Sequence, residues 1–318
     1  MFAKPYLRSQ DFPRYTKEDH LTKDPSLELS IMESTSTPLQ RILESLQVIK
    51  LMLLPNRANS AKLYDLLSTH NNLAESSLYL NLGYWKDVTT YDQACQLMAE
   101  RVAEYAEVAD TGQEILDVGC GFGDQDHFWQ NKYPSCHLTA MNICASQIEQ
   151  AKRRFPDSKV NFVTGSATQL MFPDNHFDRI IALESAFHFD TREDFFKEAY
   201  RVLKPGGVLC LADVVRKEFE LNWKIRLAIY LGQGLWQTPK ANDYPWGTYQ
   251  QKMSSAGFND IQFEDVSEYV FSPFKHYAIK RVSDPKVNAR INPILRKLWS
   301  LPHRGFEPSS YMFIKAVK

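Results

Sequence analysis

The chain has 318 residues, 44% of them hydrophobic, and a formal net charge of -1; it can therefore bury a substantial core, and it lacks the positive charge of a dedicated nucleic-acid binder. Its five cysteines include no C-x-x-C pair, which predicts reduced thiols in a cytoplasmic protein and no metal site. No apolar run reaches the roughly 18 residues expected of a membrane span.

The N-terminal third predicts helices that follow a weakly ordered start. Residues 1–36 mix charge, proline and Ser/Thr without a period, as in an extended arm. From Pro38 to Leu54, apolar residues recur every three or four positions, which predicts a helix packed on the core. Further helices are expected at 58–68 and 91–108.

From Glu114 onward, short apolar runs alternate with helical patterns, which is typical of βα units around a parallel sheet. This alternation predicts an α/β fold with a doubly wound, seven-stranded, mostly parallel sheet. Strands are expected at 114–118, 137–142, 160–164, 178–183, 207–213, 260–266 and 311–317, and helices at 124–132, 145–155 and 191–203.

The first of these strands runs into a glycine-rich turn, Gly-Cys-Gly-Phe-Gly at 119–123. The glycines alternate, and Asp124 stands where a dinucleotide-binding G-x-G-x-x-G loop would have its last glycine. Gly-x-Gly-x-Gly after a strand that carries Asp117 resembles motif I of the class I S-adenosylmethionine (SAM) methyltransferases. The resemblance implies a Rossmann-like fold with SAM as the cofactor.

A SAM site needs close backbone approach, which glycines allow, and hydrogen-bonding groups for the ribose and adenine. The family has acids at the two positions where this chain has Asn142 and Ser166, and a serine is a weaker partner than a carboxylate. The run that begins at Asn142 resembles an Asn-Ile-Ser…Gln variant of natural-product and lipid-type methyltransferases; its Gln147 is either a second contact or a solvent-facing residue. The cofactor-binding residues implied are Asp117, Gly119, Cys120, Gly121, Gly123, Asn142, Ile143, Gln147, Ser166, Ala167 and Glu184.

Upstream of the glycine turn, residues 80–85 read Leu-Asn-Leu-Gly-Tyr-Trp. This run resembles the segment that covers the cofactor in small-molecule methyltransferases. The resemblance implies that Tyr84 and Trp85 pack over the sulfonium or exclude water from it. Ordinary packing in the core is the alternative for both rings.

Methyl transfer to a hydroxyl needs a base, and two strand ends supply candidates. Glu184 and His188 follow the fourth strand, and Asp213 ends the fifth. Since carboxyl ends of adjacent parallel strands meet at the ligand crevice, we expect His188 and Asp213 to converge there. The pattern resembles sugar and polyketide O-methyltransferases, and also sterol and cyclopropane-type relatives. The resemblance implies His188 as the base, Asp213 as its helper and Glu184 as a pocket or deprotonating residue; helix capping and a turn are the alternatives for the first two.

The predicted organisation is a weakly ordered arm (1–36), a helical cap (37–110) and a SAM-binding domain (111–318) with insertions at 219–257 and 272–308. The first insertion is rich in aromatic residues and is expected to form a mobile lid suited to an apolar acceptor. The second is basic and amphipathic, which fits peripheral membrane contact, an acidic substrate group or a solvated face.

The sequence thus predicts a SAM-dependent methyltransferase of a hydrophobic small molecule, acting at a hydroxyl oxygen in natural-product biosynthesis, with His188 as general base. C- or N-methylation of a sterol, terpenoid or lipid-like acceptor is the alternative. A SAM-binding protein without catalysis is a second alternative, because Asn142 and Ser166 depart from the family pattern. The oligomeric state is left open, a homodimer included.

Overall fold

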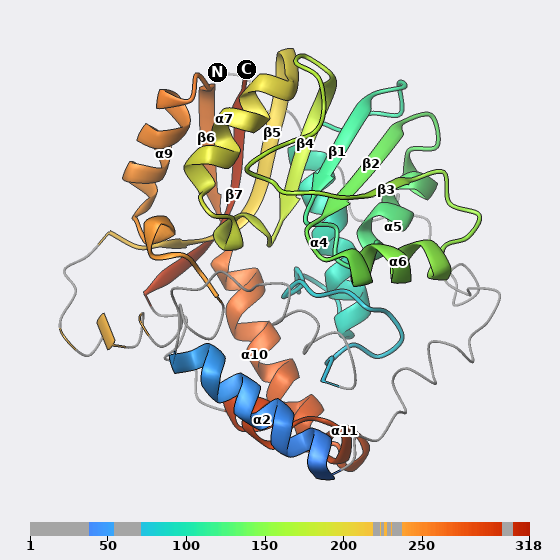
Figure 1. The fold of residues 1–318 in the computed structure, drawn as a ribbon, viewed down its shortest axis with the longest axis vertical. Helices are drawn as coiled ribbons and strands as arrows, with labels where there is room; N and C mark the ends of the chain where they lie inside the picture. The colour runs from blue at the N-terminus through green and yellow to red at the C-terminus, as the bar shows by residue number, and fades with distance from the viewer. Residues whose placement is uncertain are drawn as a thin grey trace.

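The computed structural model describes residues 38–53, 71–218, 237–300 and 308–318, with single positions 223, 226, 227 and 230. Its strands are β1 (Glu114–Val118), β2 (His137–Asn142), β3 (Asn161–Thr164), β4 (Phe177–Leu183), β5 (Leu203–Arg216), β6 (Asn259–Asp265) and β7 (Ser309–Val317). They form one sheet in the order β3-β2-β1-β4-β5-β7-β6 (Figure 1). The predicted α/β fold with seven strands is confirmed.

Strands β1 to β5 pair in parallel, whereas β7 lies antiparallel between β5 and β6. All seven predicted strands are present with small shifts at their ends; the largest difference is in β5, which begins at Leu203 where 207 was predicted. Strand order reverses between β1 and β4. That reversal opens a crevice at the carboxyl ends of the parallel strands, where open α/β sheets bind ligands.

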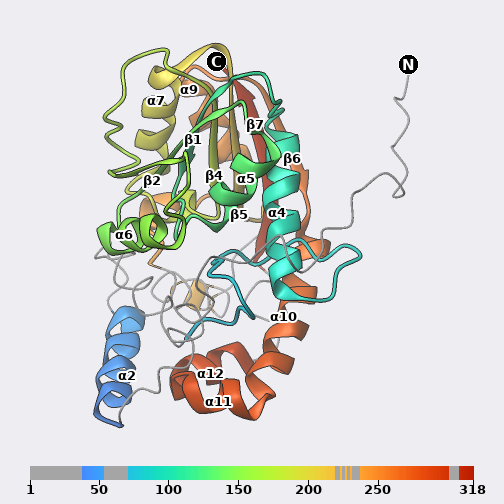
Figure 2. The same ribbon diagram turned by 90° about the vertical axis from the view of Figure 1, so that its right-hand side faces the viewer.

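Helices cover both faces of the sheet, so the central strands β1, β4 and β5 are buried on both sides, whereas most residues of the edge strand β6 are exposed. One face carries α4 (Tyr91–Tyr105), α5 (Asp124–Lys132) and α6 (Ala145–Arg154), and the other carries α7 (Arg192–Val202) and α9 (Trp246–Ser255). Successive residues of β1 point to opposite faces: Ile115 packs in the hydrophobic core under α4, α5 and α6, and Leu116 packs in the core under α7 and α9. Figure 2 shows α4 and α7 on opposite sides of the sheet.

Helices α2 (Pro38–Leu53), α11 (Pro285–Arg290) and α12 (Pro293–Ser300) lie at the bottom of Figure 2, and α10 (Ser267–Ser283) leads down to them from the sheet. The prediction that the apolar stripe of α2 packs on the core is wrong. The pattern correctly predicts an amphipathic helix, but it does not say which side packs. Val48 is buried, while the stripe is 42–65% exposed; its described members are Leu39, Ile42, Leu43, Leu46 and Ile49.

Cations of the basic insertion bind backbone carbonyl groups inside the protein. Lys275 Nζ donates to Trp299 O at 2.7 Å, Arg281 Nη2 to Ala74 O at 3.0 Å, and Arg290 Nη2 to Asn72 O at 2.7 Å. The three exposed lysines of this insertion are Lys280, Lys286 and Lys297. Membrane contact stays a prediction that rests on these lysines. Among the described residues, no helix is long and apolar enough to cross a membrane.

The predicted arm 1–36 and helix 58–68 lie outside the described residues, as does most of 219–236, the first half of the predicted lid insertion 219–257. The predicted domain boundaries stay predictions. Helix α9, in the described part of the predicted lid, contacts α7 and β6. Helix α4, in the predicted cap, contacts α5, β4 and β5. Trp129 Nε1 on α5 donates to Ala99 O on α4 at 2.9 Å, so α4 is part of the helical layer beside the sheet.

Candidate active site

A cavity of about 170 Å³ opens at the carboxyl ends of β1, β2 and β4. Residues 78–81, the turn after β1, the loop after β3 and the turn after β4 form its walls. The predicted site residues that line it are Gly119, Cys120, Gly121, Asn142, Ile143, Gln147, Ser166, Ala167, Glu184 and His188. The predicted site residues outside this lining are Tyr84, Trp85, Asp117, Gly123 and Asp213.

The three glycines of the turn are required for different reasons. A Cβ on Gly121 would contact Leu80 Cδ1 at an ordinary 3.5 Å, and both residues line the cavity. A Cβ on Gly119 would lie 2.3 Å from Ser185 Cβ, and one on Gly123 would lie 2.7 Å from Phe162. Protein atoms therefore occupy the space that a Cβ would take at Gly119 and Gly123, and only at Gly121 does the missing Cβ leave space beside the cavity. Contact of the three backbones with a cofactor stays a prediction.

Asn142 and Gln147 form a polar pair on the cavity wall. Asn142 Nδ2 donates to Gln147 Oε1 at 2.7 Å. Gln147 is 1% exposed, so its interpretation as a solvent-facing helix residue is wrong. Within the described part of the chain, the buried Nε2 of Gln147 has no hydrogen-bond acceptor. A ligand hydroxyl would supply that acceptor, so this wall fits the ribose of SAM.

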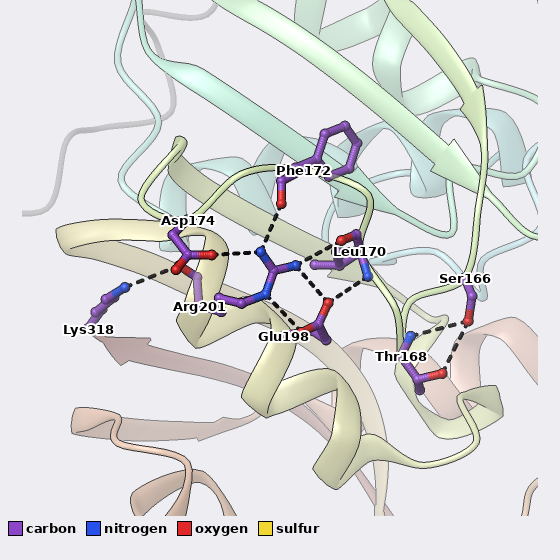
Figure 3. Close-up of polar contacts among 8 residues, drawn as sticks. All are labelled: Ser166, Thr168, Leu170, Phe172, Asp174, Glu198, Arg201 and Lys318. Atoms are coloured by element: carbon purple, nitrogen blue, oxygen red, sulfur yellow. Dashed lines mark hydrogen bonds and ion pairs between the residues drawn. The ribbon is translucent and has the colours of Figure 1, made fainter.

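An arginine on α7 hydrogen-bonds carbonyl groups of the loop after β3 (Figure 3). Arg201 Nη2 donates to Leu170 O and Nη1 to Phe172 O, both at 2.8 Å. On the cavity side, Ser166 Oγ lies 3.1 Å from Thr168 Oγ1, and both residues line the cavity. Ser166, at the position expected to reach adenine, is therefore paired with a neighbouring hydroxyl on an anchored loop.

Glu184, directly after β4, lines the cavity and connects two distant segments. Its Oε1 accepts hydrogen bonds from Leu82 N at 2.7 Å and from the Tyr311 hydroxyl at 2.6 Å. Burial raises the pKa of Glu184 to about 7, although both hydrogen bonds act in the opposite direction. Near neutral pH this carboxyl group can therefore either hold or accept a proton.

Asp117 lies beneath the glycine turn, and a second acid adjoins it. Asp117 and Asp126 are 1% and 0% exposed, and Gln125 Nε2 donates to Asp117 Oδ2 at 3.0 Å. Burial raises the pKa of both carboxyl groups. Asp117 raises the pKa of Asp126 further, whereas the hydrogen bonds from Gln125 and Asp126 lower that of Asp117, as in a pair that shares one proton. Because Gln125 lines the cavity, Asp117 reaches the site through this glutamine.

His188 lies in a short turn, η1 (Ala186–His188), that follows β4. It is 7% exposed and lines the cavity with its neighbours Phe189 and Asp190. The turn is closed by two backbone bonds: His188 N donates to Ser185 O at 3.0 Å, and Phe189 N to Ala186 O at 3.2 Å. The structure thus brings His188 and Glu184 together at one cavity.

Asp213 is bound to an arginine that the sequence interpretation did not consider. Its carboxylate forms a two-point ion pair with Arg192, at 2.9 Å to Nε and 3.1 Å to Nη2. It also accepts a 3.0 Å hydrogen bond from the Tyr249 hydroxyl. The Asp213 side chain is fully buried and outside the cavity lining, so its oxygens are committed to these partners and the expected direct pairing with His188 is not observed.

Tyr84 and Trp85 belong to the aromatic core. The Tyr84 ring lies 5.0 Å from the Tyr269 ring and 6.2 Å from Phe313, and the Trp85 ring lies 5.1 Å from Tyr277. Their packing alternative is therefore the observed arrangement. Burial of these rings against α10 and β7 removes more apolar surface from water than exposure at the cavity would.

Residues at and just before the start of this motif form the wall instead. Leu78, Leu80 and Asn81 line the cavity, and the sequence interpretation missed them. Leu78 N donates to Asp124 Oδ1 at 3.2 Å, and Asp124 forms a buried ion pair with Arg154. The run Leu-Asn-Leu-Gly-Tyr-Trp indicated the correct segment, since it contains Leu80 and Asn81, but it did not show which side chains face the cavity.

The glycine turn, the position of the cavity and the strand order define a class of proteins, the SAM-dependent methyltransferases. A family model described as "Methyltransferase domain" matches residues 116–211. Erythromycin 3''-O-methyltransferase of Saccharopolyspora erythraea is 34% identical over 230 residues, which cover 70% of this chain and 75% of that protein. The chain belongs to the class I SAM-dependent methyltransferases; it is an enzyme whose cofactor is SAM.

Two further comparisons carry less, the first because it is shorter and the second because its sequence identity is lower. Sterol 24-C-methyltransferase erg6 of Aspergillus fumigatus is 34% identical over 166 residues, which cover 49% of this chain and only 42% of that protein. The crystal structure of the [4+2]-cyclase SpnF has a TM-score of 0.63 at 22% identity and covers 82% of this chain and 97% of that one. The SpnF likeness supports the fold.

Proposed function

We propose that this methyltransferase acts on a hydroxyl oxygen of a hydrophobic small molecule, with His188 as general base. The observation that carries the proposal is the position of His188 in the cavity lining, on the turn after β4. Apolar side chains of Leu78, Leu80 and Phe189 form part of the same wall and suit an apolar acceptor. Similarity to a relative named as an O-methyltransferase favours oxygen.

SAM, when bound, supplies a methyl group on a positively charged sulfonium. Gly121 allows close approach, while Asn142 and Gln147 offer amide groups to the ribose hydroxyls. His188 would take the proton of the acceptor hydroxyl as its oxygen bonds to the methyl carbon. The electron pair of the broken carbon–sulfur bond stays on sulfur, and the products are the methyl ether, S-adenosylhomocysteine (SAH) and a protonated imidazole.

Methylation at carbon is the second candidate, because Glu184 offers a different proton acceptor. It lines the cavity, and its raised pKa suits acceptance of a proton that leaves a methylated carbon centre. Similarity to a relative named as a sterol C-methyltransferase favours this chemistry over the shared part of the chain.

The test is methyl transfer from labelled SAM to a lipid extract of the source organism and to a panel of sterol and macrolide alcohols, with products identified by mass spectrometry. His188→Gln should lower turnover by about 10²–10⁴-fold and leave SAH affinity unchanged. His176→Gln is the matched control, because His176 adjoins the opposite end of β4. If His188→Gln keeps full turnover while Glu184→Gln loses it and the product carries a new carbon–carbon bond, the second candidate replaces the first.

A further inference from the structure

One buried side chain hydrogen-bonds the carbonyl groups on both sides of His188. Asn242, at the end of η2 (Lys240–Asn242), is 3% exposed. Its Nδ2 donates to Phe187 O at 3.2 Å and to Phe189 O at 2.7 Å. Both hydrogens of a single amide group are thus directed at the two residues that flank His188.

Asn242 is itself fixed by the arginine that pairs with Asp213. Arg192 N donates to Asn242 Oδ1 at 3.0 Å, and Arg192 Nη1 donates to Asn242 O at 2.6 Å. The Arg192–Asp213 ion pair is almost fully buried, with side chains 2% and 0% exposed. A continuous set of contacts therefore runs from Asp213 through Arg192 and Asn242 to the turn that carries His188.

We infer that Asn242 is a positioning residue that fixes the His188 turn at the cavity, and that the Asp213 carboxylate acts on this turn through Arg192 and Asn242. The effect on turnover rests on the proposed role of His188, whereas the effect on the turn does not. Asp213 thus supports His188 indirectly, with Arg192 and Asn242 between them.

The chemistry of the position requires asparagine. Two carbonyl oxygens need two donors and Arg192 N needs one acceptor, and a side-chain amide supplies all three. The three-residue η1 turn has few backbone hydrogen bonds of its own, so contacts with other segments are needed to hold it in one conformation. A shift of about 1 Å in a reacting group can change rate by about 100-fold, so this contact is placed to affect catalysis.

Asn242→Asp isolates the two donors. The substitution keeps the side-chain size and the acceptor for Arg192 N, but it places an oxygen against Phe187 O and Phe189 O. Asn292→Asp is the matched control, because Asn292 is also buried and its Nδ2 donates to Arg41 O and Ser45 Oγ between α2 and α12. Both variants lose comparable donor groups, and only the first borders the cavity turn.

The readouts at pH 8 are the ¹³C-histidine NMR signal of His188, assigned by its loss in His188→Gln, and hydrogen exchange at residues 187–189. In Asn242→Asp we expect a shifted or broadened His188 signal and exchange at least tenfold faster, with SAH affinity within threefold of wild type. Asn292→Asp should change neither readout. An unchanged His188 signal and unchanged exchange in folded Asn242→Asp would overturn the inference.

Asn242→Ser serves if the aspartate variant does not fold, since a hydroxyl keeps one donor; it should give an intermediate change in both readouts, and no change would again overturn the inference. Turnover on the acceptor found above separates the two proposals. A fall in kcat with unchanged KM for SAM supports both. A displaced His188 signal with wild-type turnover leaves the positioning of the turn in place and removes His188 as the base.

Discussion

Alanine at Gly119 and at Gly121 should have different effects, although both glycines stand in one turn. Their φ angles are 100° and 58°, where a Cβ costs roughly 1–2 kcal/mol. On Gly121 the new Cβ makes only an ordinary contact, with Leu80 at 3.5 Å, whereas on Gly119 it would lie 2.3 Å from Ser185 Cβ. Overpacking of that kind adds about 1–3 kcal/mol. We expect the free energy of unfolding to fall by about 1–2 kcal/mol in Gly121→Ala and by about 2–5 kcal/mol in Gly119→Ala.

Urea denaturation and SAH calorimetry measure the two effects separately. Gly121→Ala should bind SAH at least tenfold more weakly, because its methyl group enters the cavity wall. Gly112→Ala is the control: Gly112 also has a positive φ of 76°, and its Cβ would meet only Ser135 O at 3.9 Å. It should lose about 1–2 kcal/mol and keep SAH affinity. Equal stability of Gly119→Ala and Gly121→Ala, or full SAH affinity in Gly121→Ala, would refute this reasoning.

Three further predictions concern a buried carboxyl pair, a buried aromatic ring and a partly exposed arginine. The native Asp117–Asp126 pair keeps a proton that the unfolded chain releases above about pH 4. The free energy of unfolding should therefore fall by about 1.4 kcal/mol per pH unit from about pH 4 to the raised pKa of the pair. Urea unfolding at pH 5 and pH 8 should show a smaller fall in Asp126→Asn than in the wild type, and equal falls would contradict the prediction. Tyr84→Ala should cost about 3–5 kcal/mol of stability without weakening SAH binding by calorimetry; weaker binding at unchanged stability would favour a covering role. In Arg201→Lys a single ammonium replaces the two guanidinium nitrogens that each bond one loop carbonyl, so about one hydrogen bond should be lost and SAH binding should weaken about tenfold. Unchanged affinity would show that the loop does not depend on this arginine.

The fold and the location of the site could be predicted because their determinants are local. Strand and helix periodicity set the βα alternation, and a glycine-rich turn after the first strand marks the crevice in any sheet of this type. Each residue at the carboxyl end of β1, β2 or β4 is carried to the same edge by topology. His188, Glu184, Asn142 and Gln147 accordingly meet at one cavity.

Partners across long sequence distances could not be predicted. Asp213 was expected beside His188 because their strands are neighbours, but Arg192 offers a fixed two-point geometry that binds the buried carboxylate more strongly. Tyr84 was expected at the cofactor, yet its ring packs on Tyr269. Neither outcome depends on residues close by in the sequence.

The sequence by itself determined the sheet, the glycine turn and the class of enzyme, since hydrophobic period and backbone geometry act over a few residues at a time. The tertiary structure decided what each residue contacts: Gly119 packs against Ser185, Gly121 faces the cavity, and Asn242 hydrogen-bonds the turn that holds His188. These contacts join segments whose approach is fixed only when the whole core packs, because close packing leaves each buried polar group a single set of partners.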